Sequence, residues 1–151
     1  MADIVSPEQR SDMMSEIKGK DTKPEMILRT GLHKLGFRYR LHDRGLPGKP
    51  DMVFPRYRAV VFVNGCFWHG HDCHLFKWSS TRADFWIQKI NRNKELDKIN
   101  VAKLEELEWR IGIVWECSLK GKYQLNSEEL MVICAQWLQS DLPYLEIGGQ
   151  C

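Results

Sequence analysis

The sequence lacks any apolar run approaching the roughly 20 residues that cross a bilayer, so a membrane span is not expected. Its first residues also lack the charged-then-apolar pattern of a secretory signal. Low-complexity stretches, internal repeats and a linker long enough to divide the chain are absent as well. A chain of 151 residues is therefore expected to form one domain over residues 1–151.

Acidic residues are scarce in the first two-thirds of the chain. Residues 1–100 carry 18 Lys and Arg against 12 Asp and Glu, whereas residues 101–151 carry 4 against 8. The basic part permits contact with a polyanion and the acidic part would repel one. The five cysteines are an odd number in a chain without an export signal, which favours metal ligation over a disulfide framework.

Capping signals and hydrophobic periodicity predict an α/β fold. Ser6 and Thr22 each precede a proline and a Gln or Glu, which predicts a helix over 6–17 and a second one ending near Gly36. Extended segments are predicted over 37–42, 51–54, 58–63 and 110–116, and helices over 81–107 (with a possible break) and from Asn126 or Ser127 to Leu138. This order indicates a mixed sheet flanked by helices, with residues 141–151 as a frayed tail.

A dense group of metal-ligand side chains lies between residues 66 and 74. Five Cys and His residues fall within nine positions, and Cys117 closes a strand of the same predicted sheet. Zinc takes four thiolate or imidazole ligands, and a loop can supply three while a neighbouring strand end supplies the fourth. Spacing leaves open which histidine binds: His69, His71 and His74 are all possible. The alternative is that the cysteines are small core residues.

Three acidic residues and one histidine are candidates for metal binding and acid–base chemistry. Asp51 begins a strand that faces the end of the next one, as a magnesium-binding carboxylate does, although an Asp after Pro often only caps a turn. Glu25, His69 and Asp97 could supply a general base with an orienting carboxylate. Equally, Glu25 could complete a capping box and Asp97 could lie on a solvated helix face.

Large aromatic residues follow the cysteines. Phe67 and Trp68 lie inside the metal-ligand segment, and Trp86 begins the next helix. Aromatic rings held on a rigid loop can wedge between base pairs, although core packing is the usual fate of tryptophan.

Four motifs together are far more specific than any single residue. They are Pro47-Gly48-Lys49-Pro50-Asp51, Gly65-Cys66-Phe67-Trp68-His69 followed by His71 and Cys73, Thr81-Arg82 followed by Phe85-Trp86 and Lys89-Ile90, and Val114-Trp115-Glu116-Cys117. In these motifs the chain resembles the very short patch repair endonucleases, over residues 10 to 138. The resemblance implies a restriction-endonuclease-like fold with a structural Zn²⁺, and a Mg²⁺-dependent nick 5′ to the T of a T·G mismatch in double-stranded DNA. Such mismatches arise by deamination of 5-methylcytosine, which links the family to a cytosine-5 methyltransferase and a repair polymerase.

The resemblance also assigns roles to residues of this chain. It implies that Asp51 and the backbone carbonyl of Val63 hold Mg²⁺, that His69 is a general base steadied by Asp97, and that Glu25 holds metal-bound water. Zinc would be bound by Cys66, His71, Cys73 and Cys117. Phe67, Trp68 and Trp86 would enter the duplex from the major groove, and Met14, in an N-terminal arm over residues 1–20, from the minor groove. The implied enzyme is a monomer of the bacterial cytoplasm, associated with the nucleoid.

One position departs from the family pattern. The family usually has a histidine where this chain has Asn64, and an amide can donate a hydrogen bond to phosphate but cannot act as an acid. We therefore expect an active enzyme that is slower or altered in pH dependence. Two alternatives are a non-catalytic zinc-stabilised module that binds mismatched DNA, and a restriction endonuclease of the same fold that cuts both strands.

Overall fold

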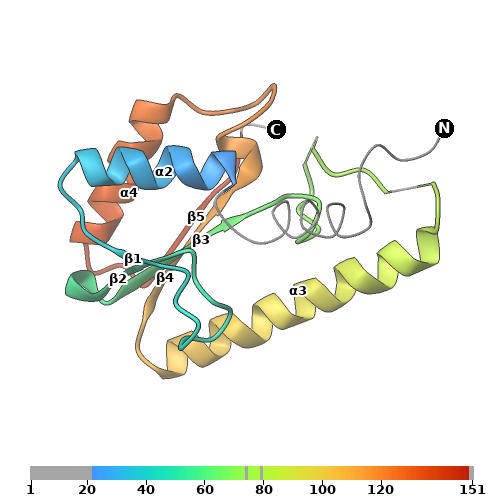
Figure 1. Ribbon diagram of the computed structural model, residues 1–151, viewed down its shortest axis with the longest axis horizontal. Coiled ribbons are helices and arrows are strands. Elements are labelled where there is room, and N and C mark those ends of the chain that lie inside the picture. Colours follow the sequence, from blue (N-terminus) through green and yellow to red (C-terminus); the bar gives the residue numbers. More distant parts are fainter. Residues whose placement is uncertain (1–21, 74, 79, 150–151) are drawn as a thin grey trace, which may run out of the picture.

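The computed structural model describes residues 22–73, 75–78 and 80–149. The helix predicted over 6–17, the arm over 1–20, Met14 and His74 lie outside these residues. In the described part, five strands form one mixed sheet in the order β1-β2-β3-β4-β5 (Figure 1). Their bounds are Arg40–Leu41, Met52–Phe54, Ala59–Asn64, Arg110–Trp115 and Tyr144–Ile147. The prediction of an α/β fold with a mixed sheet and flanking helices is confirmed.

Three helices cover the two faces of the sheet. Helices α2 (Lys23–Lys34) and α4 (Ser127–Gln139) lie together on one face, and α3 (Ala83–Glu106) lies on the other and extends beyond the strands (Figure 1). Thr22 and Asn126 cap α2 and α4, as predicted, because their side-chain oxygens accept backbone N–H groups of the first turn. Helix α3 is continuous, without the break that the sequence left open.

The two cores differ in extent. Between the sheet and the pair α2 and α4, fifteen buried residues form one cluster that includes Leu28, Phe54 and Trp137. Between the sheet and α3 the cluster is smaller, and from α3 only Leu104 contributes a buried side chain to it. Several apolar residues of the segment predicted as a helix over 81–107 are exposed rather than packed on the sheet: Phe85, Leu96, Ile99 and Leu107.

Two predictions about strands are wrong. Only Arg40–Leu41 of the segment 37–42 is paired, because its partner β2 is three residues long and ends at Phe54, before a short 3-10 helix that begins at Pro55. The segment 141–151 is not a frayed tail over its whole length. Residues Tyr144–Ile147 form β5, which pairs in parallel with β4 from Ile111↔Tyr144 to Val114↔Ile147.

The strand directions bring the candidate residues to one edge of the sheet. Strands β3 and β4 are parallel, with Asn64 opposite Trp115, so the segments after residues 64 and 115 leave the sheet side by side. Strand β2 is antiparallel to β3 and pairs Met52 with Val61, so Asp51 lies where β3 is ending. The edge at the carboxyl ends of parallel strands is the usual location of binding sites in open α/β sheets.

Candidate active site and metal centre

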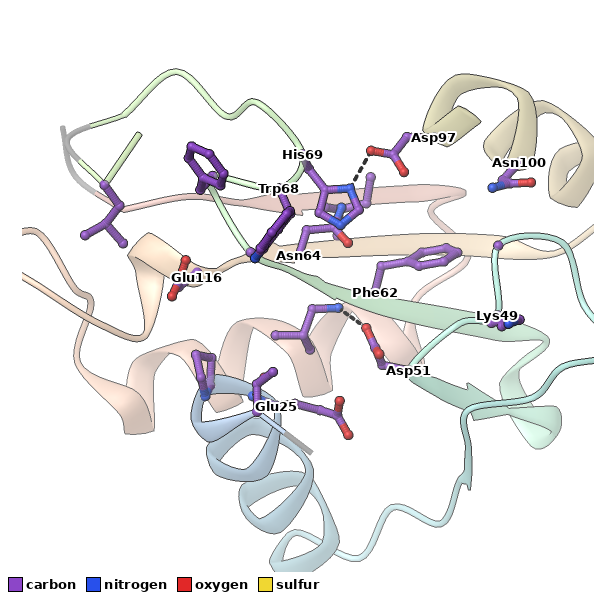
Figure 2. A pocket seen from close by; sticks show the side chains of 18 of the residues that line it. Glu25, Lys49, Asp51, Phe62, Asn64, Trp68, His69, Asp97, Asn100 and Glu116 are labelled. Carbon is purple, nitrogen blue, oxygen red and sulfur yellow. Dashed lines mark hydrogen bonds and ion pairs between the residues drawn. The ribbon is translucent and has the colours of Figure 1, made fainter. Parts of the chain in front are cut away.

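A cleft of about 600 Å³ opens at this edge of the sheet. Its lining includes all the predicted catalytic side chains, which come from five different elements or loops: Glu25, Asp51, Asn64, His69 and Asp97. Figure 2 shows Glu25 and Asp51 on one side of β3 and His69 with Asp97 on the other, all around the same hollow. Folding therefore gathers residues that are up to 72 positions apart, the separation between Glu25 and Asp97.

Asp51 is fixed against the end of β3. The backbone N–H of Val63 donates a hydrogen bond to Asp51 Oδ2 at 2.6 Å (Figure 2). Burial raises the pKa of the Asp51 carboxyl from 3.8 to about 7; the Val63 hydrogen bond opposes this rise and the nearby Glu25 adds to it. The surroundings of Asp51 therefore do not fully stabilise its negative charge. A bound cation would supply the missing stabilisation.

Glu25 is the second carboxylate of this side of the cleft. It lies in the first turn of α2 and is only 2% exposed. Its Oε2 atom contacts Arg29 Nη1 at 2.9 Å and His42 Nε2 at 3.0 Å. Glu25 is therefore a buried, held acid beside Asp51, a role that its place in the capping motif alone would not indicate.

His69 and Asp97 form a hydrogen-bonded pair. Nδ1 of His69 lies 2.6 Å from Oδ2 of Asp97, which α3 presents to the loop that follows β3. A carboxylate can only accept, so Nδ1 carries the proton and Nε2 keeps the lone pair that a general base requires. Asp97 is thus directed toward the cleft, whereas the sequence also allowed it a solvated helix face.

Asn64 is the last residue of β3 and is 8% exposed. It lines the cleft between the Glu25–Asp51 pair and the His69–Asp97 pair, close to His69 (Figure 2). Its amide is therefore placed to contact whatever the cleft binds, in agreement with the importance that the sequence gave to this position.

Four sulfur and nitrogen ligands converge beside the cleft. Cys66, His71, Cys73 and Cys117 place their ligand atoms within 4.8 Å of one another. His71 Nδ1 is 3.5 Å from both Cys66 Sγ and Cys117 Sγ. In a tetrahedral zinc site with Zn–S of about 2.3 Å and Zn–N of about 2.05 Å the S···N separation is about 3.6 Å. The ligand set and its spacing fit a zinc ion, and among the described residues His71 is the histidine that meets the three cysteines.

The surroundings of this cluster support metal binding. Burial raises the pKa of the Cys66 and Cys117 thiols, so their thiolates require a cation for stability, and burial lowers the pKa of His71, which keeps its imidazole neutral. Trp115 stacks on the His71 ring with centroids 4.1 Å apart, and the Gly149 N–H lies 3.1 Å from Cys117 Sγ. The segment after β5 thus covers the cluster and helps to hold its ligands.

The three predicted aromatic side chains contact one another next to the cleft. The ring centroids of Phe67 and Trp68 are 5.3 Å apart, and Trp86 lies 5.3 Å and 5.6 Å from them. All three are half-buried, so none belongs to the core. Asn93 of α3 donates a hydrogen bond to the Trp68 carbonyl at 2.8 Å, which anchors the loop that carries both Trp68 and His69.

The sequence analysis did not single out two polar residues of the cleft, Lys49 and Glu116, or His42 beside it. Lys49 lines it near Asp51 with a left-handed backbone (φ 49°), and Glu116 accepts the Cys66 N–H at 3.1 Å. His42 contacts Glu25. Lys49 and Glu116 stand inside the quoted motifs, which was a usable signal, but His42 follows an unremarkable edge strand.

Within the described ranges, no helix is both long and apolar enough to span a membrane.

Comparison with known proteins identifies the family. The family model described as DNA mismatch endonuclease Vsr matches residues 2–75. The chain is 44% identical over 150 residues to the DNA mismatch endonuclease Vsr of Escherichia coli K12, covering 99% of this chain and 96% of that protein. It is 45% identical over 119 residues to the type II nicking enzyme V.XorIIP of Xanthomonas oryzae, covering 79% and 88%.

A third relative gives the same picture. The type II nicking enzyme V.NmeAIP of Neisseria meningitidis is 44% identical over 122 residues, covering 81% of this chain and 87% of that protein. The cleft, the cysteine cluster and the aromatic group thus lie in a chain that shares 44% identity with a Vsr endonuclease over nearly its full length. The chain belongs to the Vsr family of DNA mismatch endonucleases.

Proposed function

We propose that this chain is a DNA endonuclease that cuts one strand of a duplex on the 5′ side of the T in a T·G mismatch. The observation that carries the proposal is the arrangement of the cleft. A hydrogen-bonded His–Asp pair and two carboxylates, the buried Glu25 and the half-buried Asp51, face one hollow, and three aromatic rings lie beside it.

His69 is the proposed general base. Its Nε2 atom takes a proton from the attacking water while Asp97 holds the ring and stabilises the charge that develops on it. The Asn93 bond to the Trp68 carbonyl and the Asp97 bond to His69 hold two successive loop residues from one face of α3. The base is therefore fixed before DNA enters.

Asp51, with the backbone carbonyl of Val63, is the proposed holder of Mg²⁺. In an extended strand the N–H and C=O of one residue face the same neighbour, and the Val63 N–H faces Asp51. When bound, Mg²⁺ would supply positive charge to the scissile phosphate and the leaving oxygen. Glu25 would hold water at this ion, and Asn64 would donate a hydrogen bond to a phosphate oxygen.

The cysteine cluster is proposed to hold Zn²⁺ in a closed, structural site. Its four ligands leave no open position, and the loop it fixes carries both the base and two of the aromatic rings. Phe67, Trp68 and Trp86 would enter the duplex where a wobble pair is already weakened, because unstacking a mispaired step costs less than unstacking a matched one.

The wider setting follows from the same proposal. The fold is proposed to be restriction-endonuclease-like, and the protein to act as a monomer in the bacterial cytoplasm, with Met14 and the N-terminal arm on the minor-groove side. Its work would follow that of a cytosine-5 methyltransferase and precede resynthesis by a repair polymerase.

Cleavage of end-labelled duplexes tests the proposal. A set of T·G duplexes with varied flanking bases and matched T·A controls is incubated with Mg²⁺, and the product ends are mapped on both strands. We expect a single nick 5′ to the mismatched T, absent without Mg²⁺ and absent in His69→Ala. Cuts in both strands, or equal rates on T·A and T·G, would favour a restriction enzyme, and mismatch binding without cleavage would favour a non-catalytic module.

A further inference from the structure

His42 stands next to both carboxylates of the cleft. Its Nε2 atom lies 3.0 Å from Glu25 Oε2, and the ligand atoms of Glu25, His42 and Asp51 all lie within 4.8 Å of one another. The three side chains come from separate parts of the chain: the start of α2, the residue after β1 and the residue before β2. They form a mixed imidazole–carboxylate cluster.

The backbone fixes His42 to Asp51. The His42 N–H donates to the Asp51 carbonyl at 3.1 Å, directly after the short β1–β2 ladder. His42 adopts a left-handed conformation with φ 50°, which is uncommon for a residue with a side chain. The ring is half-buried, with 19% of its side chain exposed. The position of the imidazole is therefore determined by the fold rather than by a free loop.

Two carboxylates lie side by side in this cluster. Arg29 Nη1 contacts Glu25 Oε2 at 2.9 Å. Asp51 receives the Val63 N–H, which is a dipole and not a charge. The negative charge of Glu25 disfavours ionisation of Asp51, and a divalent cation between the two carboxylates would relieve this repulsion.

We propose that His42 Nε2 is a protein ligand of the divalent cation held beside Asp51. This inference rests on the proposed cation-dependent function and deepens it. In the cation-free protein His42 Nε2 lies 3.0 Å from Glu25 Oε2, and a cation bound by both groups would lie among these atoms and the Asp51 carboxylate. A nitrogen donor among carboxylate oxygens favours first-row transition ions over Mg²⁺. The site accordingly binds Mn²⁺ in the absence of DNA and more tightly than Mg²⁺.

Pulsed electron paramagnetic resonance of bound Mn²⁺ tests this without DNA and without turnover. The zinc-loaded protein is titrated with Mn²⁺, and the ¹⁴N coupling of a directly bound imidazole is recorded. We expect that coupling in the parent protein and its loss in His42→Gln, together with at least about tenfold weaker Mn²⁺ binding. Glutamine keeps a hydrogen-bond donor for Glu25 but is a poor nitrogen ligand, so it separates ligation from positioning.

His33→Gln is the matched control, because His33 lies on the exposed last turn of α2 and outside the cleft. It should leave both the coupling and the affinity unchanged. Mn²⁺ that binds without ¹⁴N coupling, an unchanged coupling in His42→Gln, or no Mn²⁺ binding to the DNA-free protein would each overturn the inference. T·G nicking by the parent protein with Mg²⁺ is scored separately, so either proposal can fail while the other stands.

Discussion

The chain carries two clusters of potential metal ligands, and they differ in chemistry and in access. The first consists of Cys66, His71, Cys73 and Cys117, and it is covered by Trp115 and by the segment after β5. The second consists of Glu25, His42 and Asp51; its two carboxylates line the open cleft, and His42 lies beside them. The sheet edge at the end of β3 supports both.

This difference shows how one edge serves two purposes. Soft sulfur ligands in a closed set hold an ion permanently, and the stability of the loop depends on it. Hard oxygen ligands in an open cleft leave coordination positions for water and substrate. The loop between residues 65 and 82 joins them, because it begins in the sulfur cluster and carries His69 into the cleft. A substitution in one cluster should therefore change stability, zinc content and nicking differently from a substitution in the other.

Cys117→Ser should have the largest effect, because it breaks the closed cluster. Serine does not replace a thiolate as a zinc ligand, and the metal-binding free energy is part of the folding free energy. We expect loss of zinc, loss of nicking and a fall in Tm of roughly 10 °C, corresponding to about 3 kcal/mol. Metal analysis and thermal denaturation measure the two effects together.

Cys134→Ser is the control for this variant. Cys134 is a buried residue of α4 that packs in the core and is not part of the cluster. Its replacement should leave the zinc content unchanged. A Cys117→Ser protein that retains stoichiometric zinc would contradict the assigned ligand set.

Asp51→Asn should break the open cluster and leave the closed one intact. We expect nicking to fall on the order of 10³-fold, because the principal cation-binding charge is gone, with normal zinc content.

The folded-state pKa of Asp51 lies above 3.8, so its ionisation costs stability as the pH rises from about 4 to about 7. At pH 8 without divalent cation the variant should therefore be more stable, on the order of 2 kcal/mol. A lower Tm than the parent protein at that pH would argue against this account.

Trp68→Ala tests the loop that joins the two clusters. Loss of one base–aromatic stack should reduce discrimination between T·G and T·A duplexes about five- to tenfold, with a smaller change in affinity for matched DNA. Competition binding on the two duplexes gives both numbers. Trp78→Ala removes an exposed indole further along the same segment and should leave discrimination unchanged. A uniform loss on both duplexes would assign Trp68 a packing role.

Asn64→His should have the smallest effect, and it tests whether residue 64 takes part in the reaction beside the open cluster. An imidazole at this position could donate a proton to the leaving oxygen, which the amide cannot do. We expect a rate increase of a few-fold, on the order of 1 kcal/mol in the barrier, that is greatest at low pH. Nicking rates from pH 6 to 9 measure it. Identical profiles for both proteins would show that this position does not limit turnover.

Local signals in the sequence predicted a large part of the fold. Thr22 and Asn126 cap their helices as expected, and the apolar runs before Asn64 and at residues 110–115 became the two central strands. These signals are reliable because each depends on a few adjacent residues. The strand Tyr144–Ile147 was missed because it is short and follows a proline, and its stability comes from its neighbour β4.

The candidate site was predicted only as far as its motifs extended. Asp51, His69 and the four cysteine-cluster ligands stand in those motifs, and the structure brings them to one edge. His42 has no local signal, because its significance comes from a 3.0 Å contact with a residue 17 positions earlier.

The amino-acid sequence supplies the side chains of the site: a concentrated set of sulfur and imidazole ligands, a few acids beside strand ends, and aromatic rings among them. Which of these side chains meet depends on how the elements pack. Only the packing of α3 against the loop brought Asp97 to His69 and left His71 to the cysteines, and only the antiparallel pairing of β2 with β3 set Asp51 beside Val63. The reason is that ligand spacing along a chain limits which atoms can meet, whereas burial and hydrogen bonding across elements select which of them do.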